Sequence, residues 1–255
     1  MLRNFKTAVQ FLTILPVGRS HETNEADLAK SMVYFPVVGF LIGIILVYAD
    51  KLLLWFLPDT IENVVLLFIM VMLTRALHID GLADTLDGMM GGRDAESRLR
   101  IMKDSRIGTA GVLGIVLVLL MKYAGLNNLF YEAKTSVLLT APVFGRWSQM
   151  LMMFKADYGR ERGIGKAFVG HLRLGGLAAA SVLAIGLSAF VIYSYEMRTA
   201  ILAVGIPCAV GLFTLLWRWW IVKRLGGVTG DAIGAASELS ELLTLLLFVF
   251  LMNGR

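Results

Sequence analysis

Long apolar segments recur along the chain and alternate with short polar stretches. Seven of them approach the length of a membrane-spanning helix: 32–49, 61–77, 107–126, 135–154, 174–195, 199–219 and 238–252. A bilayer core is crossed by a helix of about 20 apolar residues. The pattern therefore predicts an all-α fold, a polytopic membrane helical bundle of about seven transmembrane helices. The last segment is apolar only from Leu242 to Met252, so a spanning helix has to begin earlier, near Ala235.

The first residues have the periodicity of a helix with one apolar face. This face is formed by Phe5, Ala8, Val9, Leu12 and Leu15. Such a stripe predicts an N-terminal interfacial helix that lies along the membrane surface or packs on the bundle. Pro16 is expected to end this helix, and the polar residues 17–31 are expected to form a surface loop.

Composition and charge support a membrane protein. Hydrophobic residues make up 57% of the chain and the mean hydropathy is +0.73, which is well above the range of soluble domains. A net charge of +5 would also fit a nucleic-acid-binding protein. The charge follows membrane topology instead: with the N-terminus in the cytoplasm, seventeen lysines and arginines fall in inside segments. The five in outside segments are Lys51, Lys122, Lys134, Arg198 and Arg255. We therefore predict an N-terminus inside, a C-terminus outside, membrane lipid around the chain and no nucleic-acid partner.

This topology brings three polar stretches to the same cytoplasmic face, namely 78–106, 155–173 and 223–241. An enzyme that acts at the membrane surface has its polar chemistry on one face. A transporter more often carries ionisable groups through the bilayer midplane. The distribution favours an enzyme, in a single integral-membrane catalytic domain spanning 1–255.

The densest candidate chemistry lies in residues 78–88. In a helix, Asp80, Asp84 and Asp87 are spaced i, i+4 and i+7 and share one face. Three ionised carboxylates at this spacing repel one another unless a cation neutralises them. Oxygen ligands suit a hard cation such as Mg²⁺, which also binds substrate phosphates. His78 precedes this cluster and is a candidate base or ligand, with a structural hydrogen bond as the alternative.

A cationic stretch follows directly and contains Arg93 and Lys103, which we interpret as phosphate contacts. Asp104 is a candidate metal ligand or general base, or alternatively a helix cap together with Ser105. Arg146 lies inside an apolar segment and therefore needs a partner or a polar cavity, and it is a further candidate phosphate contact. The alternative interpretation of these charged loops is a solvent-exposed surface without a binding function.

The stretch 226–235 is rich in glycine and contains Asp231, and Glu238 and Glu241 follow it. Glycines let backbone amides approach an anion closely. We predict that Asp231, Glu238 or Glu241 approaches the same metal site as the acidic helix. The alternatives are a turn with close helix packing for the glycines, and a cap or a pairing with Lys223 and Arg224 for the glutamates.

Several motifs together resemble the cobalamin synthase family, whose activity is adenosylcobinamide-GDP ribazoletransferase. The motifs are His78-x-Asp80-Gly-Leu-x-Asp84-x-x-Asp87-Gly88, Ile101-Met-Lys-Asp-Ser105 with Gly108 and Gly111, Gly145-Arg146-Trp147, Gly227-x-Thr-Gly-Asp231-x-x-Gly-Ala235 with Glu238 and Glu241, Phe11-Leu-Thr-x-Leu-Pro16 and Tyr34-Phe-Pro-x-Val-Gly39. The resemblance runs from residue 5 to about residue 245. The combination is specific, whereas any one motif alone is not.

The resemblance implies an enzyme of the prokaryotic inner membrane that performs a late step of vitamin B12 synthesis with Mg²⁺ as cofactor. It would join adenosylcobinamide-GDP to α-ribazole, or to its 5′-phosphate, and release GMP. Its metal ligands would be Asp80, Asp84 and Asp87, with Asp104 as a further ligand or the base. The oligomeric state does not follow from the sequence.

Two other classes remain as alternatives. Membrane CDP-alcohol phosphotransferases also use an aspartate-rich helix, but their pattern has an arginine where this chain has Asp84. A cation transporter would place acids deep in its helices, whereas here most acids are expected at cytoplasmic helix ends.

Overall fold

The computed structural model describes residues 2–18, 25–161, 163–194 and 199–253, which are helical apart from turns, loops and one isolated β-bridge between Tyr158 and Val228. The α-helices in chain order are α1 Leu2–Leu12, α2 Glu25–Ser31, α3 Phe35–Leu53, α4 Asp59–Leu73, α5 Leu77–Gly91, α6 Ala95–Ile101, α7 Thr109–Asn127, α8 Tyr131–Met153, α9 Leu174–Ser194, α10 Thr199–Leu225 and α11 Gly230–Asn253. Short 3₁₀ helices are η1 Met32–Tyr34 and η2 Ile164–Ala167. The predicted all-α class is confirmed.

Five of the described segments are long and apolar enough to cross a membrane, and a bent pair made of α4 and α5 would be a sixth. The five are Asp27–Leu53, Thr109–Asn127, Leu174–Ser194, Ile201–Leu225 and Gly230–Met252. These spans give the bundle of a polytopic membrane protein, while the count of seven with an interfacial helix stays a prediction. The segment predicted at 135–154 lies in α8, which is 23 residues long but carries Glu132, Lys134 and Arg146.

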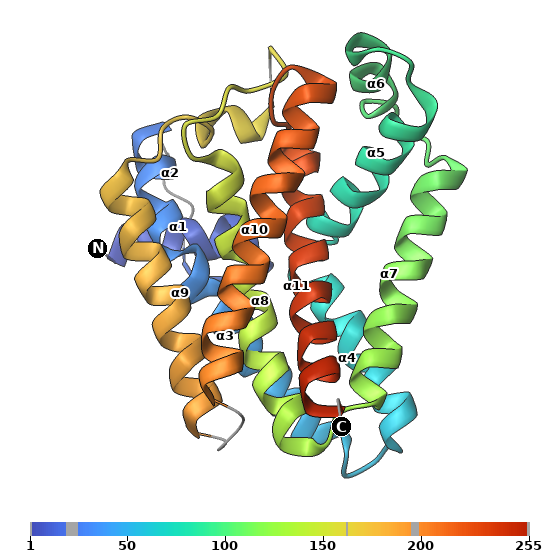
Figure 1. Cartoon of the computed structure of the whole chain (residues 1–255), viewed down its shortest axis with the longest axis vertical. Helices are drawn as coiled ribbons and strands as arrows, with labels where there is room; N and C mark the ends of the chain where they lie inside the picture. The colour runs from blue at the N-terminus through green and yellow to red at the C-terminus, as the bar shows by residue number, and fades with distance from the viewer. Residues whose placement is uncertain (1, 19–24, 162, 195–198, 254–255) are drawn as a thin grey trace.

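Helix α8 lies in the middle of the bundle beside α11, with α9 and α10 on one side and α4, α5 and α7 on the other (Figure 1). Its side chains are buried along most of its length. Its polar residues therefore contact protein rather than lipid, which removes the need for a uniformly apolar sequence. Gly39 permits the close crossing of α3 and α8, because a Cβ at this position would lie 2.3 Å from the carbonyl oxygen of Pro142.

The apolar segment predicted at 61–77 is two helices in the structure. Helix α4 ends at Leu73, α5 starts at Leu77, and the two are bent by 87°. Arg75 and Ala76 both have φ of 55° at this break, a left-handed conformation that costs a residue with a side chain about 1–2 kcal/mol. The amide of Ile14 donates a hydrogen bond of 2.9 Å to the carbonyl of Leu73 and so satisfies part of the open helix end.

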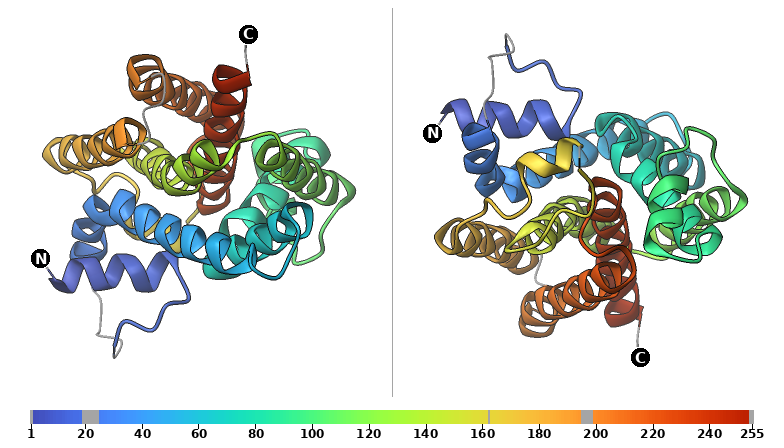
Figure 2. Two further views of the ribbon diagram at one scale, coloured as in Figure 1. Left: turned by 90° about the horizontal axis from the view of Figure 1, so that it is seen from below. Right: turned by 90° about the horizontal axis from the view of Figure 1, so that it is seen from above.

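The N-terminal segment packs on the bundle at this break. Helix α1 is seen side-on in both end views, so it lies across the long axis of the bundle (Figure 2). Ala8, Val9 and Leu12 of the predicted stripe are buried. The helix ends at Leu12, before Pro16, because the chain turns there to reach the end of α4.

Two further boundaries differ from the sequence prediction. Residues 25–31 of the expected loop 17–31 form α2, whose Leu28 and Ala29 pack against the core; residues 19–24 lie outside the described residues. Helix α11 begins at Gly230 rather than near Ala235. The side chain of Thr229 accepts a hydrogen bond of 3.2 Å from the amide of Ala232 and caps this earlier start.

The three polar stretches of the sequence analysis lie at the same end of the bundle, the upper end in Figure 1. The loop after α8 is tied to the start of α11 by two backbone hydrogen bonds, Gly159 N to Val228 O and Val228 N to Asp157 O, of 2.8 and 2.9 Å. The guanidinium of Arg98 on α6 donates to the carbonyl of Arg224 at 3.2 Å. This end of the molecule therefore combines α5, α6, the α8–α9 loop and the α10–α11 turn.

Candidate active site

A cavity of about 380 Å³ lies between α5, α8 and the start of α11, with the α8–α9 loop as a further wall. Its polar lining consists of Gln10, Thr74, Arg75, His78, Asp80, Gln149, Tyr158, Arg160 and Asp231. Phe11, Phe35, Met153 and Phe168 contribute apolar lining. The cavity therefore brings together His78, Asp80 and Asp231, which the sequence analysis had singled out in two distant motifs.

A close helix crossing aligns the two acidic motifs. A Cβ at Gly81 would lie 2.8 Å from the carbonyl oxygen and 2.9 Å from the Cα of Asp231, so α5 and α11 meet at a distance that only glycine permits. The crossing brings Asp80 and Asp84 alongside Asp231. Asp84 is repelled by Asp231 and Asp80 and attracted by Arg160. The concentration of negative charge predicted for α5 thus extends to α11.

Asp87, the third carboxylate of α5, lies against a different neighbour. Its Oδ2 accepts a hydrogen bond of 2.7 Å from the amide of Gly108, and its Oδ1 accepts one of 2.8 Å from the amide of Gly111. These are orphan donors at the N-terminus of α7, so Asp87 performs the capping that the sequence analysis considered for Asp104 and Ser105. A metal-ligating Asp87 would have to use the lone pairs that these bonds leave free.

Asp231 is paired with a cation from the α8–α9 loop. Nη2 of Arg160 lies 2.6 Å from Oδ2 of Asp231, and the same nitrogen is 3.4 Å from the carbonyl of Met102. Beside this pair, burial raises the pKa of Tyr158. The Tyr158 hydroxyl is therefore protonated at neutral pH and can donate a hydrogen bond into the cavity.

His78 connects the cavity to a buried network of charges. Its Nε2 lies 2.7 Å from Nε2 of Gln149, and its Nδ1 lies 3.5 Å from Nη2 of Arg146. A guanidinium group only donates, so Nδ1 of His78 is the acceptor and Nε2 carries the proton. Nε2 then donates a hydrogen bond to the amide oxygen of Gln149, which requires the oxygen and nitrogen of this side-chain amide to be exchanged. Both ring nitrogens thus have partners. This geometry favours a positioning role for His78 over that of a base.

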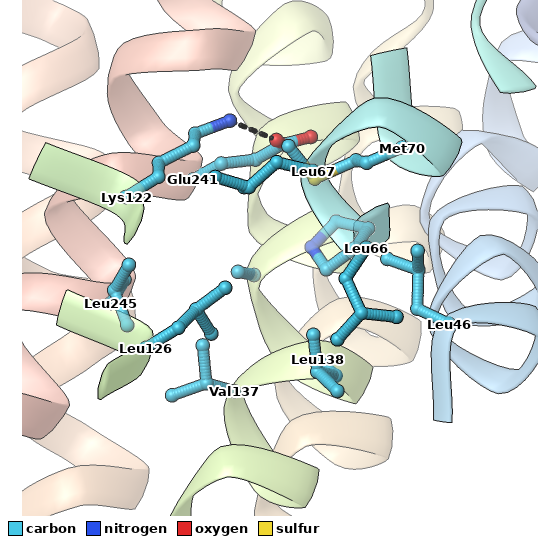
Figure 3. A pocket seen from close by; sticks show the side chains of 12 residues that line it. Leu46, Leu66, Leu67, Met70, Lys122, Leu126, Val137, Leu138, Glu241 and Leu245 are labelled. Carbon is cyan, nitrogen blue, oxygen red and sulfur yellow. Dashed lines mark hydrogen bonds and ion pairs between the residues drawn. The ribbon is translucent and has the colours of Figure 1, made fainter. Parts of the chain in front are cut away.

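Behind His78, the network continues across three helices. Arg146 on α8 forms an ion pair with Oε1 of Glu241, and Lys122 on α7 lies 2.8 Å from Oε2 of Glu241 and 2.7 Å from Oε2 of Glu238. Figure 3 shows Lys122 and Glu241 at the edge of a small apolar cavity lined mainly by leucines. Charges in such surroundings are stable only when they are paired.

The two glutamates therefore have partners that the sequence analysis did not identify. Glu238 and Glu241 were expected near the metal site or, alternatively, near Lys223 and Arg224. Both are buried instead, with 4% and 2% of their surface exposed, and both bind Lys122. Lys122 was counted among the outside cations and in fact lies inside the bundle. The same correction applies to Lys134, which is buried against Asp50 and Glu62 at 2.6 and 2.5 Å.

Arg93, Lys103 and Asp104 are exposed around α6 and do not line the cavity. Hydrogen bonds from the Arg106 side chain, at 3.1 and 2.7 Å, hold the pKa of Asp104 at about 2. So acidic a carboxyl group is a poor base at neutral pH. In this arrangement Asp104 serves to hold Arg106, while Arg146 neutralises Glu241 rather than facing a phosphate.

Comparison with known proteins decides the family. The sequence model of the cobalamin-5-phosphate synthase family matches residues 4–249. The chain belongs to this family. It is 39% identical to an adenosylcobinamide-GDP ribazoletransferase of Geotalea daltonii over 98% of both chains. The protein of the same name from Clostridioides difficile is 34% identical over 98% of both chains, and that from Syntrophobacter fumaroxidans is 38% identical over 96% of this chain and 97% of the relative. No solved structure matches the chain.

Within the described residues of this family member, no three His, Cys, Asp or Glu side chains already converge as ligands of a metal ion would. The donor chemistry nevertheless fits a hard cation, because the groups around Asp84 are carboxylates. Asp231 also has a buried Oδ2 that accepts no well-formed hydrogen bond from the described residues, despite its ion pair with Arg160. Asp80 and Asp231, which line the cavity, are thus the residues that best fit a divalent cation, together with Asp84, which lies near both of them.

Six polar residues of the cavity were not predicted from the sequence, namely Gln10, Thr74, Arg75, Gln149, Tyr158 and Arg160. Arg75 stands only three residues before His78, and its position at the end of an apolar segment was a usable signal. Arg160 and Tyr158 lie in a polar loop without a distinctive pattern. Their relevance depends on the contact of this loop with the start of α11, which no local pattern reveals.

Proposed function

We propose that this protein is an adenosylcobinamide-GDP ribazoletransferase. It transfers the adenosylcobinamide-phosphate moiety of adenosylcobinamide-GDP to α-ribazole, or to its 5′-phosphate, and releases GMP. The observation that carries the proposal is that one cavity is lined by Asp80 and Asp231, from two of the motifs, together with Arg75 and Arg160. Carboxylates and guanidinium groups together suit a metal-complexed diphosphate.

In the proposed reaction, a ribose hydroxyl of the acceptor attacks the phosphorus that bears the cobinamide arm. The bond from this phosphorus to the oxygen of GMP breaks, GMP leaves, and the hydroxyl proton passes to a base. Mg²⁺ held by Asp80, Asp84 and Asp231 would neutralise charge on the diphosphate oxygens. Arg75 and Arg160 are placed to bind phosphate, and Tyr158 to donate a hydrogen bond to an oxygen in the cavity.

The break between α4 and α5 and the charged residues outside the cavity add detail to this proposal. The left-handed Arg75 and Ala76 at the α4–α5 break turn α5 so that Asp80 lines the cavity, a strained arrangement of the kind found at functional sites. Lys103 and Arg93 remain candidates for later contacts with the large corrin substrate at the exposed rim. Asp87 remains a candidate metal ligand through its free lone pairs.

The rival functions have less support. The family match over residues 4–249 disfavours a CDP-alcohol phosphotransferase. A transporter was expected to carry acids deep in its helices, and Glu238, Glu241 and Glu62 do lie deep. Each of them is held by Lys122 or Lys134, however, and the pairs resemble fixed structural networks rather than an ion path.

The decisive assay is product release. Purified protein supplied with adenosylcobinamide-GDP, α-ribazole and Mg²⁺ is expected to release GMP, and EDTA is expected to stop the release. A CDP-linked alcohol with the same acceptor should yield no CMP. Release of CMP without GMP, or no release from either donor with folded protein, would overturn the proposed function.

The orientation in a prokaryotic inner membrane is also a proposal, supported by the seventeen-to-five distribution of basic residues. Moving Lys122 and Lys134 to the interior lowers the outside count and strengthens this bias. A reporter active only in the cytoplasm should work when fused after Arg93 or Gly165 and fail after Asp59 or Tyr131. The reverse pattern would place the cavity outside the cell and contradict the proposed access to GDP-linked substrate.

A further inference from the structure

The ion pair between Arg160 and Asp231 lies at the wall of the cavity that we propose as the binding site of a metal–diphosphate complex. Their side chains are 11% and 22% exposed, and the charged atoms are 2.6 Å apart at the cavity wall. The pair is incompletely satisfied: Nε of Arg160 is buried without a hydrogen-bond partner among the described residues, and the contact between Nη2 of Arg160 and Oδ2 of Asp231 is an ion pair that lacks hydrogen-bond geometry. A pair that served only as a structural clasp would be expected to use these atoms fully.

The electrostatic surroundings explain why Asp231 needs a cation. Asp80 and Asp84 are close enough to repel it, and Arg160 is its compensating charge. A divalent cation bound by these carboxylates would supply the same compensation. Two cationic groups then compete for one carboxylate, so metal binding weakens the hold of Asp231 on Arg160.

The side chain of Arg160 is able to move without its backbone. Residues 157–159 are fixed to Val228 by the two backbone hydrogen bonds of 2.8 and 2.9 Å. Beyond Asp231, the one other polar partner of the guanidinium among the described residues is the carbonyl of Met102, at the long distance of 3.4 Å. Rotation of the side chain would therefore swing the charge within the cavity that Arg75 also lines.

We propose that Arg160 is an exchangeable counter-ion: it neutralises Asp231 in the empty site and transfers to the diphosphate of the nucleotide substrate when Asp231 binds a divalent cation. The inference rests on the proposed function for the identity of this diphosphate. The exchange couples the two ligands: metal binding to Asp231 frees Arg160 for the diphosphate, and diphosphate binding to Arg160 frees Asp231 for the metal. Metal and nucleoside diphosphate therefore bind cooperatively, and Arg160 contributes to binding of the nucleotide rather than to binding of the metal.

The test measures the affinities for Mn²⁺ and for GDP, which are expected to change in opposite directions in each variant. In the absence of nucleotide, Arg160→Gln should bind Mn²⁺ more tightly than the wild type, by about fivefold to tenfold, because Asp231 has lost its competitor. In EDTA, the same variant should bind GDP about tenfold more weakly. Asp231→Asn should show the inverse pattern, with weaker Mn²⁺ binding and tighter GDP binding in EDTA. Mn²⁺ binding is followed by electron paramagnetic resonance and GDP binding by calorimetry, in detergent.

Two controls separate exchange from disruption of the fold. Arg160→Lys retains the competing charge and should leave Mn²⁺ affinity close to that of the wild type. Lys166→Gln removes an exposed cation from the same loop, whose amine contacts only the carbonyl of Glu161 at 3.0 Å among the described residues, and should change neither affinity. If Arg160→Gln lowers or preserves Mn²⁺ affinity, the pair is a fixed clasp and the inference is wrong.

The outcome is independent of the assay for the proposed function. A wild-type protein that releases GMP, combined with an Arg160→Gln variant that fails to gain Mn²⁺ affinity, would remove the exchange and leave the function standing. The opposite changes in affinity together with no GMP release from the cobinamide substrate would retain the exchange at a metal–diphosphate site and remove the proposed function.

Discussion

Asp84→Asn is expected to lower Mg²⁺-dependent GMP release by at least about 100-fold while the protein remains folded. The substitution keeps the size of the side chain and removes the negative charge of Asp84 from the cluster of carboxylates that it forms with Asp80 and Asp231. Loss of a metal-binding charge weakens neutralisation of the diphosphate in the transition state. Loss of repulsion among carboxylates has the opposite, mildly favourable effect on folding.

The measurement pairs turnover with thermal unfolding in detergent. Asp59→Asn serves as the control, because Asp59 is an exposed carboxylate at the start of α4, at the opposite end of the bundle, and its loss should leave turnover intact. Raising the Mg²⁺ concentration should recover part of the Asp84→Asn activity. Full GMP release by this variant at ordinary Mg²⁺ would show that Asp84 is not a metal ligand.

Lys122→Met should destabilise the fold by about 3–5 kcal/mol, the typical result of breaking a buried ion pair on one side. Lys122 is 3% exposed and lies within 2.8 Å of both Glu238 and Glu241. Without the ammonium group, Glu241 keeps its ion pair with Arg146, whereas Glu238 loses the ion pair that it forms in the structure. The midpoint of unfolding in detergent should fall sharply, and less folded protein should be recovered from the membrane.

The double variant Lys122→Met with Glu238→Gln tests the cause. It removes one carboxylate with the cation and should regain a large part of the lost stability, since Glu241 keeps its pair with Arg146. Lys51→Met is the matched control, because Lys51 is exposed near the end of α3 and its loss should have little effect. Equal destabilisation by Lys122→Met and the double variant would contradict a charge-based explanation.

Much of the molecule was predictable from local patterns. Long apolar runs require helices in a membrane, because backbone polar groups there have no water to bind. The helical spacing of Asp80, Asp84 and Asp87 was confirmed by α5, and the close contact at Gly81 places this helix beside Asp231, while their shared metal site stays a prediction. The motif combination indicated the family over nearly the full chain, which the comparisons confirm.

What the sequence could not determine was how its charged residues pair. Helix periodicity assigns a side chain to a face, but the partner on that face comes from whichever helix packs there. The sequence therefore predicted Lys122 as a cation outside the membrane, whereas in the structure it is a buried partner of Glu238 and Glu241. The sequence predicted Asp87 as one of three equivalent carboxylates on α5, whereas in the structure it caps α7 through the amides of Gly108 and Gly111.

The same reason explains the break between α4 and α5 and the composition of the cavity. The segment 61–77 is apolar throughout its length apart from its ends, and only the neighbouring chain at Ile14 shows why it stops at Leu73. Arg160 approaches Asp231 because the α8–α9 loop is bonded to the segment before α11. The sequence by itself determined the helices, the acidic motif and the family, since these depend on neighbours within a few turns. The tertiary structure decided which charges neutralise each other and which line the cavity, since those contacts join residues from distant segments.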